Sequence, residues 1–226
     1  MEGEPTVVIN KYLAELLGTF ILVGLGSLGI LAVGGPGGPA EIIAIAFAFG
    51  LALLAGIWVV GHVSGAHFNP AVTLAFWADR RMSLPDAIGY WVAQFAGAGV
   101  ASLVVWVVAG SREAVAATAT GYQDLGTAIV IEVLLTAVFV WTVMAAGSRG
   151  ALHAPAAISL TLVAVHLAGI PFSGSSVNPA RSFGPAVVGA DVGQLGVYIY
   201  APLIGALIAW SLYRLFPVER VERVVA

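Results

Sequence analysis

The sequence contains SGAHFNPAVT at residues 64–73 and SGSSVNPARS at residues 173–182, two stretches that share the tripeptide Asn-Pro-Ala. Asn is a favourable helix N-cap, and Pro is preferred at the first helical position, where its missing N–H costs no hydrogen bond. We therefore expect helices to start at Asn69-Pro70-Ala71 and at Asn178-Pro179-Ala180. One Asn-Pro pair is also a common turn signal. Two copies at matching places in the chain indicate a repeated structural element.

The apolar segment after each tripeptide is too short to cross a membrane. A ten-residue helix, such as Pro70–Asp79, is about 15 Å long, half the roughly 30 Å thickness of the bilayer hydrocarbon. The second segment ends near Val188. We expect two re-entrant half-helices, each preceded by irregular backbone, which is tolerated at membrane depth only where protein buries it or water lines it.

The rest of the chain is strongly apolar. Of its 226 residues, 60% are hydrophobic and 9% are charged, whereas about a quarter of the residues in a soluble domain are charged. Six segments approach the roughly 20 apolar residues that a transmembrane helix needs. They are Tyr12–Val33, Ile42–Gly61, Ala87–Gly110, Leu125–Gly147, Leu152–Ile170 and Leu195–Tyr213. Alternating ten-residue strands are not visible, so we predict an all-α membrane protein.

Composition also excludes several functions. A net charge of −3 without a separate basic block argues against a nucleic-acid partner. The chain has no cysteine, which excludes disulfides, thiolate metal sites and a cysteine nucleophile. Neither a Ser/His/Asp spacing, a metal-ligand cluster nor a phosphate-binding loop is visible. We therefore predict a protein that is not an enzyme and that binds no metal or cofactor.

The two halves of the chain repeat each other. Glu15 and Glu132 lie early in the first span of each half, within similar apolar surroundings, and Asn-Pro-Ala follows the second span of each half. Three spans per half is an odd number, so the halves must have opposite orientations in the membrane. We expect one channel domain over residues 1–226, made of inverted repeats at approximately 8–110 and 125–216, an architecture typical of solute pathways.

The inverted repeat brings the two half-helices together, N-terminus to N-terminus, at the membrane centre. Both positive dipole ends then point at one spot, where the amides of Asn69 and Asn178 can donate hydrogen bonds to a water molecule. The same field repels cations. A coupled secondary transporter also uses inverted repeats and broken helices, but it needs a charged or ion-coordinating centre, and here two neutral amides are expected.

Lys and Arg residues predict the orientation, because they are enriched in cytoplasmic loops. With a cytoplasmic N-terminus, seven lie inside and two, Arg112 and Arg181, lie outside. The seven are Lys11, Arg80, Arg81, Arg149, Arg214, Arg220 and Arg223. We therefore expect a multi-pass protein of the plasma membrane with both termini in the cytoplasm.

Glu15 and Glu132 are carboxylates within predicted spans, and two interpretations compete. Intramembrane carboxylates often relay protons. A re-entrant loop also exposes unpaired backbone N–H groups, for which a buried carboxylate is a strong acceptor. One Glu per half fits the second interpretation, in which each braces one loop and Gln94 assists.

Residues Gly61–Thr73 and Ser176–Gly184 resemble the two signature loops of the aquaporin (major intrinsic protein) family, and the resemblance extends over nearly the whole chain. It is closest to the bacterial aquaporin Z-type water channels. The resemblance implies six spans and two half-helices per protomer, a pore in each protomer, and a homotetramer in the lipid bilayer.

The family also has a second constriction on the extracellular side of its pore. Offsets from each Asn match its four positions to Phe49, His166, Ser175 and Arg181. A deep charge such as Arg181 is by default functional, and His166 in an apolar span is a better pore liner than a helix-packing residue.

Phe and His together are the pattern of the family's water channels, since glycerol facilitators have a smaller residue at the His position. Ser182 and Ala186 also match the water channels, whereas Ile199 after Tyr198 departs from their usual pair of aromatics. We predict a passive water channel that excludes protons and ions. The alternative is a facilitator of glycerol or another small neutral solute on the same fold.

Overall fold

The structure is a computed structural model that describes residues 5–149 and 153–216. Within these residues it contains helices and no strand. The helices are α1 (Pro5–Ala32), α2 (Pro39–Ser64), α3 (Pro70–Ala78), α4 (Leu84–Ala109), α5 (Arg112–Ala116), α6 (Leu125–Arg149), α7 (Ala154–Ser173), α8 (Pro179–Val188) and α9 (Leu195–Leu215). Six of them, α1, α2, α4, α6, α7 and α9, are long and apolar enough to cross a membrane. The predicted fold class is confirmed.

The helix boundaries differ from the expected spans by a few residues at most ends; for example, α1 begins at Pro5 and α2 ends at Ser64. Helix α7 continues through Pro171 to Ser173, beyond the expected end at Ile170, while the expected start at Leu152 lies outside the described residues. The short helix α5 was not expected, because five residues are too few for a periodic apolar pattern. It forms because the hydroxyl of its N-cap, Ser111, accepts a hydrogen bond from the backbone N–H of Ala114.

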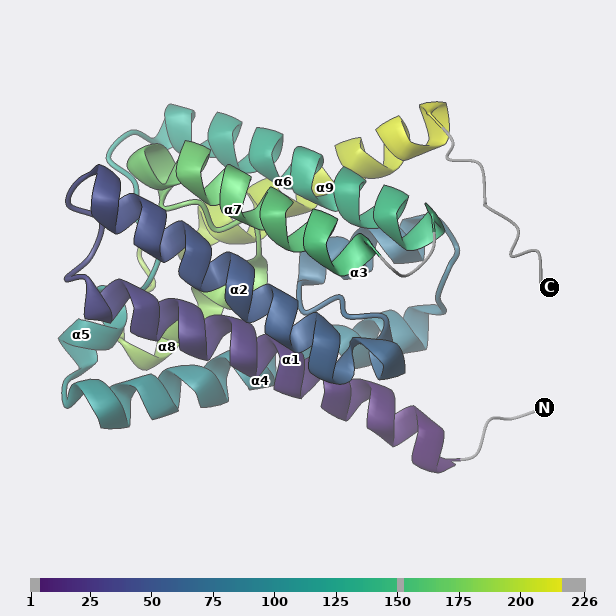
Figure 1. Cartoon of the computed structure of the whole chain (residues 1–226), viewed down its shortest axis with the longest axis horizontal. Helices are drawn as coiled ribbons and strands as arrows, with labels where there is room; N and C mark the ends of the chain where they lie inside the picture. Colours follow the sequence, from purple (N-terminus) through teal and green to yellow (C-terminus); the bar gives the residue numbers. More distant parts are fainter. Residues whose placement is uncertain (1–4, 150–152, 217–226) are drawn as a thin grey trace.

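The long helices lie side by side in one bundle (Figure 1). In the first half, α1 packs against α2 and α4, and in the second half α6 packs against α7 and α9. Contact between α2 and α7 joins the two halves. The half-helices cross over, since α3 packs mainly against α9 of the other half and α8 mainly against α4.

The half-helices enter the bundle from opposite ends. Figure 1 shows α3 toward the end where α1 begins and α9 finishes, and α8 with α5 toward the other. We call these the α3 end and the α5 end. The chain therefore starts and finishes its helical bundle on the same side.

Two glycines allow the long helices to approach closely beside the buried glutamates. A Cβ atom on Gly97 would lie 2.3 Å from the carbonyl oxygen of Leu16, and one on Gly205 would lie 2.5 Å from that of Val133. Leu16 and Val133 directly follow Glu15 and Glu132. Small residues of this kind are typical of close helix crossings in membranes. The crossings fix where the two carboxylates lie relative to the loops.

Candidate pore and selectivity filter

The two half-helices begin at the tripeptides, with the Asn side chains as caps. Asn69 Oδ1 accepts a hydrogen bond of 2.8 Å from the N–H of Ala71, and Pro70 is the first helical residue. In the second copy, Asn178 Oδ1 accepts a hydrogen bond of 3.0 Å from the N–H of Ala180, and Pro179 begins the helix. The caps satisfy backbone donors that a helix start leaves free, one at Asn69 and two at Asn178, whose Oδ1 also accepts from the N–H of Arg181 at 3.3 Å.

Each Asn also reaches across to the opposite loop. Asn69 Nδ2 donates to the Val177 carbonyl at 2.8 Å, and Asn178 Nδ2 donates to the Phe68 carbonyl at 2.9 Å. A side-chain amide has two N–H donors, so each Asn keeps one for another acceptor. Both residues line one narrow cavity. We call it the pore cavity; its lining includes Phe49, His67, Asn69, His166, Asn178 and Arg181.

The backbone before each tripeptide is irregular in the same way. Non-glycine residues with left-handed backbone occupy the third and the first position before each Asn. They are Ala66 (φ 57°) and Phe68 (φ 48°) in the first loop, and Ser175 (φ 49°) and Val177 (φ 46°) in the second. Such conformations cost about 1–3 kcal/mol each and persist only where surrounding contacts hold them.

Glu15 supplies such contacts for the first loop. Its fully buried carboxylate accepts four hydrogen bonds, from Ser64 Oγ (2.7 Å), the backbone N–H groups of His67 (2.9 Å) and Phe68 (2.7 Å), and Gln94 Nε2 (2.7 Å). The backbone donors come from the strained segment itself. The carboxylate therefore satisfies N–H groups that no helix can satisfy at this depth.

Glu132 does the same for the second loop. It is also fully buried and accepts hydrogen bonds from Ser173 Oγ (2.7 Å) and the backbone N–H groups of Ser176 and Val177 (both 2.8 Å). The two carboxylates thus have matching partners at matching positions of the two loops.

Two tyrosines in matching places also hold the loops, and sequence reasoning missed this role. Tyr90 OH donates to the Ser64 carbonyl, and Tyr198 OH donates to the Ser173 carbonyl, both at 2.7 Å. The available signal was their spacing, since they follow Asn69 and Asn178 by 21 and 20 residues. Aligning the two repeats through the last spans would have paired them.

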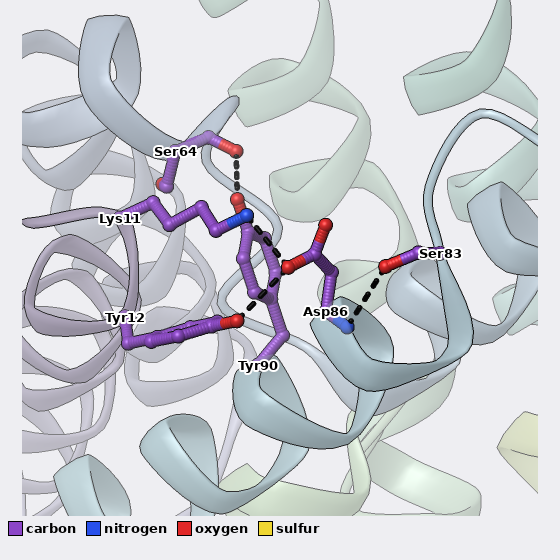
Figure 2. A network of polar contacts seen from close by, with 6 residues as sticks. All are labelled: Lys11, Tyr12, Ser64, Ser83, Asp86 and Tyr90. Carbon is purple, nitrogen blue, oxygen red and sulfur yellow. Dashed lines mark hydrogen bonds and ion pairs between the residues drawn. The ribbon is translucent and has the colours of Figure 1, made fainter. Parts of the chain in front are cut away.

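Figure 2 shows the surroundings of Tyr90 at the α3 end. Asp86, in the first turn of α4, accepts hydrogen bonds from Lys11 Nζ (2.6 Å) and Tyr12 OH (2.9 Å) on α1. The ring of Tyr12 meets the ring of Tyr90 edge-on, with centroids 6.0 Å apart. These contacts join α1, α4 and the end of α2, from which the first loop departs.

Toward the α5 end, three of the four expected constriction residues come together. The rings of Phe49 and His166 are stacked with centroids 4.8 Å apart, and Arg181 Cζ lies 4.7 Å from the centroid of the Phe49 ring. They come from α2, α7 and α8, and all three are buried and line the pore cavity.

These side chains present both a donor and an acceptor. His166 Nδ1 lies 3.0 Å from the Leu162 carbonyl. A carbonyl only accepts, so in the neutral ring Nδ1 carries the proton and Nε2 is an acceptor. Arg181 Nη1 donates to the Thr118 carbonyl at 3.1 Å. Neither His166 Nε2 nor Arg181 Nε has a protein partner within the described part of the chain.

The fourth expected residue, Ser175, is not among the residues that line the pore cavity, although its neighbour Ser176 is. The Ser175 hydroxyl donates to the Val165 carbonyl at 2.9 Å and so points its side chain toward α7. Its side chain is therefore engaged within the protein, which leaves its backbone carbonyl as the group that could serve a permeating molecule.

Ile199, which departs from the pattern of water channels, lies away from the pore cavity. With Trp91, Phe95 and Phe183 it lines an apolar groove between α4 and α9. Ile199 is not among the residues that line the pore cavity. The departure therefore does not alter the surfaces that face a permeating molecule there.

The pore cavity is very small, with a volume of about 10 Å³. One water-sized probe sphere occupies roughly 10–15 Å³. The cavity continues past both Asn caps to the Phe49–His166–Arg181 cluster. A cavity of this size has room for about one water molecule at a time.

Fold and site together define a multi-pass membrane channel, and comparisons with known proteins give its family. Residues 4–213 match the family model described as Major intrinsic protein. The chain is 37% identical to aquaporin Z of Photorhabdus laumondii, covering 94% of this chain and all of that protein. It is 40% identical to glycerol uptake facilitator protein-like 6 of Lactiplantibacillus plantarum, covering 89% and 95%.

A solved structure gives the same fold. The aquaglyceroporin from Plasmodium falciparum matches with a TM-score of 0.82 over 91% of this chain and 95% of that one, at 22% sequence identity. The chain belongs to the major intrinsic protein family, the aquaporins, whose members are channels and not enzymes.

Proposed function

We propose that this protein is a passive water channel, with a pore in each protomer, that largely excludes glycerol, ions and protons. The observation that carries the proposal is the close cluster of Phe49, His166 and Arg181 in the lining of the pore cavity. Two rings and a guanidinium group leave little space between them.

Hydrogen bonding supports the passage of water. Water that leaves bulk solvent for an apolar setting loses hydrogen bonds worth several kcal/mol. His166 Nε2 offers an acceptor, and Arg181 Nε with one N–H of each Asn offers donors. A water molecule can therefore exchange its partners one after another along the passage. Glycerol could satisfy its hydroxyl groups here only if its carbon atoms also fitted.

Electrostatics support the exclusion of ions. Arg181 is 4% exposed, so solvent screens its charge weakly. The N-termini of α3 and α8 direct two positive dipole ends toward the pore cavity. Positive fields of this kind oppose cations and protons in water channels.

The rival function is transport of glycerol or another small neutral solute. It has support from the similarity to a protein named as a glycerol uptake facilitator. His166 argues against it, because the resemblance associates a smaller residue at this position with glycerol facilitators. Ser182 and Ala186 argue in the same direction.

We also infer the assembly and orientation of the channel. The expected arrangement is a homotetramer in the plasma membrane, in which each protomer is one domain of two inverted repeats, at approximately 8–110 and 125–216. Lys11, Arg80, Arg81 and Arg214 belong to the α3 end and Arg112 to the α5 end. Of the other Arg residues counted for the inside, Arg220 and Arg223 lie outside the described residues. A cytoplasmic α3 end with both termini inside follows from this bias.

His166→Gly tests the proposal in proteoliposomes. The substitution removes bulk from one side of the constriction and keeps the Arg181 charge. We expect glycerol permeability to rise about tenfold or more, the scale of discrimination that a few buried methylene-sized groups provide, while water permeability persists. Leu167→Gly is the matched control, because it places the same backbone change on an exposed position of α7. Unchanged glycerol flux in a folded His166→Gly protein would count against the assignment.

A further inference from the structure

A chain of buried hydroxyl groups lies behind the constriction. Thr120 Oγ1 is 2.6 Å from Ser182 Oγ, which is 2.6 Å from Ser176 Oγ. Ser176 Oγ in turn donates to the backbone carbonyl of Asn178 at 2.9 Å. Ser176 and Ser182 are 1% exposed and Thr120 is 9% exposed, so almost all of each side chain is in contact with protein.

The number of protons available gives this row of hydrogen bonds one direction. A hydroxyl has a single proton to donate. Ser176 gives its proton to a carbonyl, which can only accept, so Ser182 must donate to Ser176. Ser182 has then used its own proton and must accept from Thr120. The donor-to-acceptor direction is therefore from Thr120 through Ser182 and Ser176 to the carbonyl of Asn178. Hydrogen bonds aligned in this way strengthen one another.

The row of hydroxyl groups lies in the wall between an open pocket and the pore cavity. Thr120 and Ser182 line an open pocket of about 680 Å³ at the α5 end, called here the outer pocket. Ser176 lines the pore cavity. The segment 117–124 that carries Thr120 also provides the Thr118 carbonyl that binds Arg181. One connection between helices thus holds two neighbouring residues of α8, Arg181 and Ser182.

The first repeat has the same contact with a different outer partner. Thr73, four residues after Asn69, lies 3.0 Å from Nδ1 of the pore-lining His67, as Ser182 lies against Ser176. The donor to Thr73 is Gln94 Nε2 at 2.9 Å, from within the long helix α4. In the second repeat the donor, Thr120, belongs to a connecting segment. In the second repeat, the pore wall at Ser176 is therefore positioned by the connecting segment 117–124.

We propose that Ser182 is a positioning residue for solute selectivity, which relays the placement of segment 117–124 to Ser176 in the wall of the pore, while the same segment holds Arg181 directly. The proposal rests on the proposed function, since it assigns to the Phe49–His166–Arg181 cluster the discrimination between water and glycerol. Ser182 touches no permeating molecule in this account, because it is not among the residues that line the pore cavity.

Ser182→Ala and Thr120→Val test the relay in proteoliposomes, with water and glycerol permeabilities measured on the same preparations. Loss of one buried neutral hydrogen bond changes an equilibrium by about fivefold. We expect either substitution to raise the ratio of glycerol to water permeability by about that factor. The double variant should show no further rise, because both changes interrupt one chain. Ser182→Thr, which keeps the hydroxyl, should retain the wild-type ratio.

The matched control is Ser102→Ala. Ser102 is also buried, and its hydroxyl donates to the Ala98 carbonyl beside α8 without contacting the relay. We expect it to lower thermal stability at most and to keep the wild-type ratio. A folded Thr120→Val or Ser182→Ala protein with the wild-type ratio would overturn the proposal, as would an equal rise for Ser102→Ala. If Ser182→Ala does not fold, Thr120→Val alone decides.

This result can be separated from failure of the proposed function. Wild-type protein that passes glycerol as readily as water would contradict water selectivity and leave the relay testable. In that case the same variants are compared with erythritol, the next larger polyol. The relay predicts the same order of variants, and identical erythritol permeabilities would overturn it.

Discussion

At the residue scale, the two buried glutamates have the contacts of structural acceptors. Glu15 receives four hydrogen bonds and Glu132 receives three, and in each case two donors are backbone N–H groups of the strained loop. Neither residue is among those that line the pore cavity. A proton relay needs a path to both sides of the membrane, whereas these carboxylates are enclosed by donors.

Glu15→Gln and Glu132→Gln should therefore lower the stability of the protein without changing any proton current across the membrane. A Gln side chain replaces one acceptor oxygen by a donor, which faces N–H groups that then lack a partner. We expect a loss of about 3 kcal/mol, within the range for removing a charged acceptor from buried donors. A lower midpoint of thermal unfolding in detergent is the measurement.

Glu113→Gln is the matched control, because Glu113 is exposed on α5. Its unfolding midpoint should equal that of the wild type. The relay interpretation would be correct instead if the variants of the buried glutamates unfolded like the wild type and changed a proton current across vesicle membranes.

At the scale of the elements, the helix crossings locate the glutamates. Gly97 on α4 contacts the backbone of α1 at Leu16, and Gly205 on α9 contacts the backbone of α6 at Val133. A carbonyl oxygen of a helix cannot move aside as a flexible side chain can. The crossing distances thus depend on the absence of a Cβ atom at these two positions.

Gly97→Ala should loosen the first crossing. The new methyl group would lie 2.3 Å from the Leu16 carbonyl oxygen, and overpacking of this kind costs about 1–3 kcal/mol. The unfolding midpoint in detergent is expected to fall. Gly99→Ala on the same helix is the control, because a Cβ atom there meets nothing within 4 Å. Equal effects of the two substitutions would mean that the crossing tolerates the extra volume.

The positions of the helices could be predicted from the sequence more completely than the contacts between their side chains. Apolar length predicted the six spans, and the cap chemistry of Asn69 and Asn178 predicted where α3 and α8 begin. The pairing of α3 with α9 and of α8 with α4 could not be read in the same way, because periodicity within a segment says nothing about its neighbour.

At the constriction, too, the sequence predicts positions along the chain better than the directions of side chains. Phe49, His166 and Arg181 lie far apart in the sequence and were matched through offsets from the Asn residues. An offset fixes a position along the chain and not the direction of its side chain. In the second loop, Ser175 and Val177 have left-handed backbone, and the side chain of Ser175 turns to the Val165 carbonyl while its neighbour Ser176 lines the cavity.

At the scale of the whole molecule, the pore is a joint product of the two halves. Phe49 comes from α2 in the first half, while His166 and Arg181 come from α7 and α8 in the second. Each Asn donates to a carbonyl of the other half's loop. Since each half-helix also packs mainly against the opposite half, neither half alone contains a complete passage.

The most direct test of water selectivity is stopped-flow light scattering of proteoliposomes that contain the wild-type protein, beside empty liposomes of the same lipid. In a sorbitol gradient, the account predicts shrinkage much faster than that of empty liposomes, because water crosses the Phe49–His166–Arg181 cluster in single file. In a glycerol gradient, it predicts equally fast shrinkage and then reswelling no faster than that of empty liposomes. Glycerol entry as fast as water movement would contradict the assignment, and the glycerol facilitator would then be the correct function.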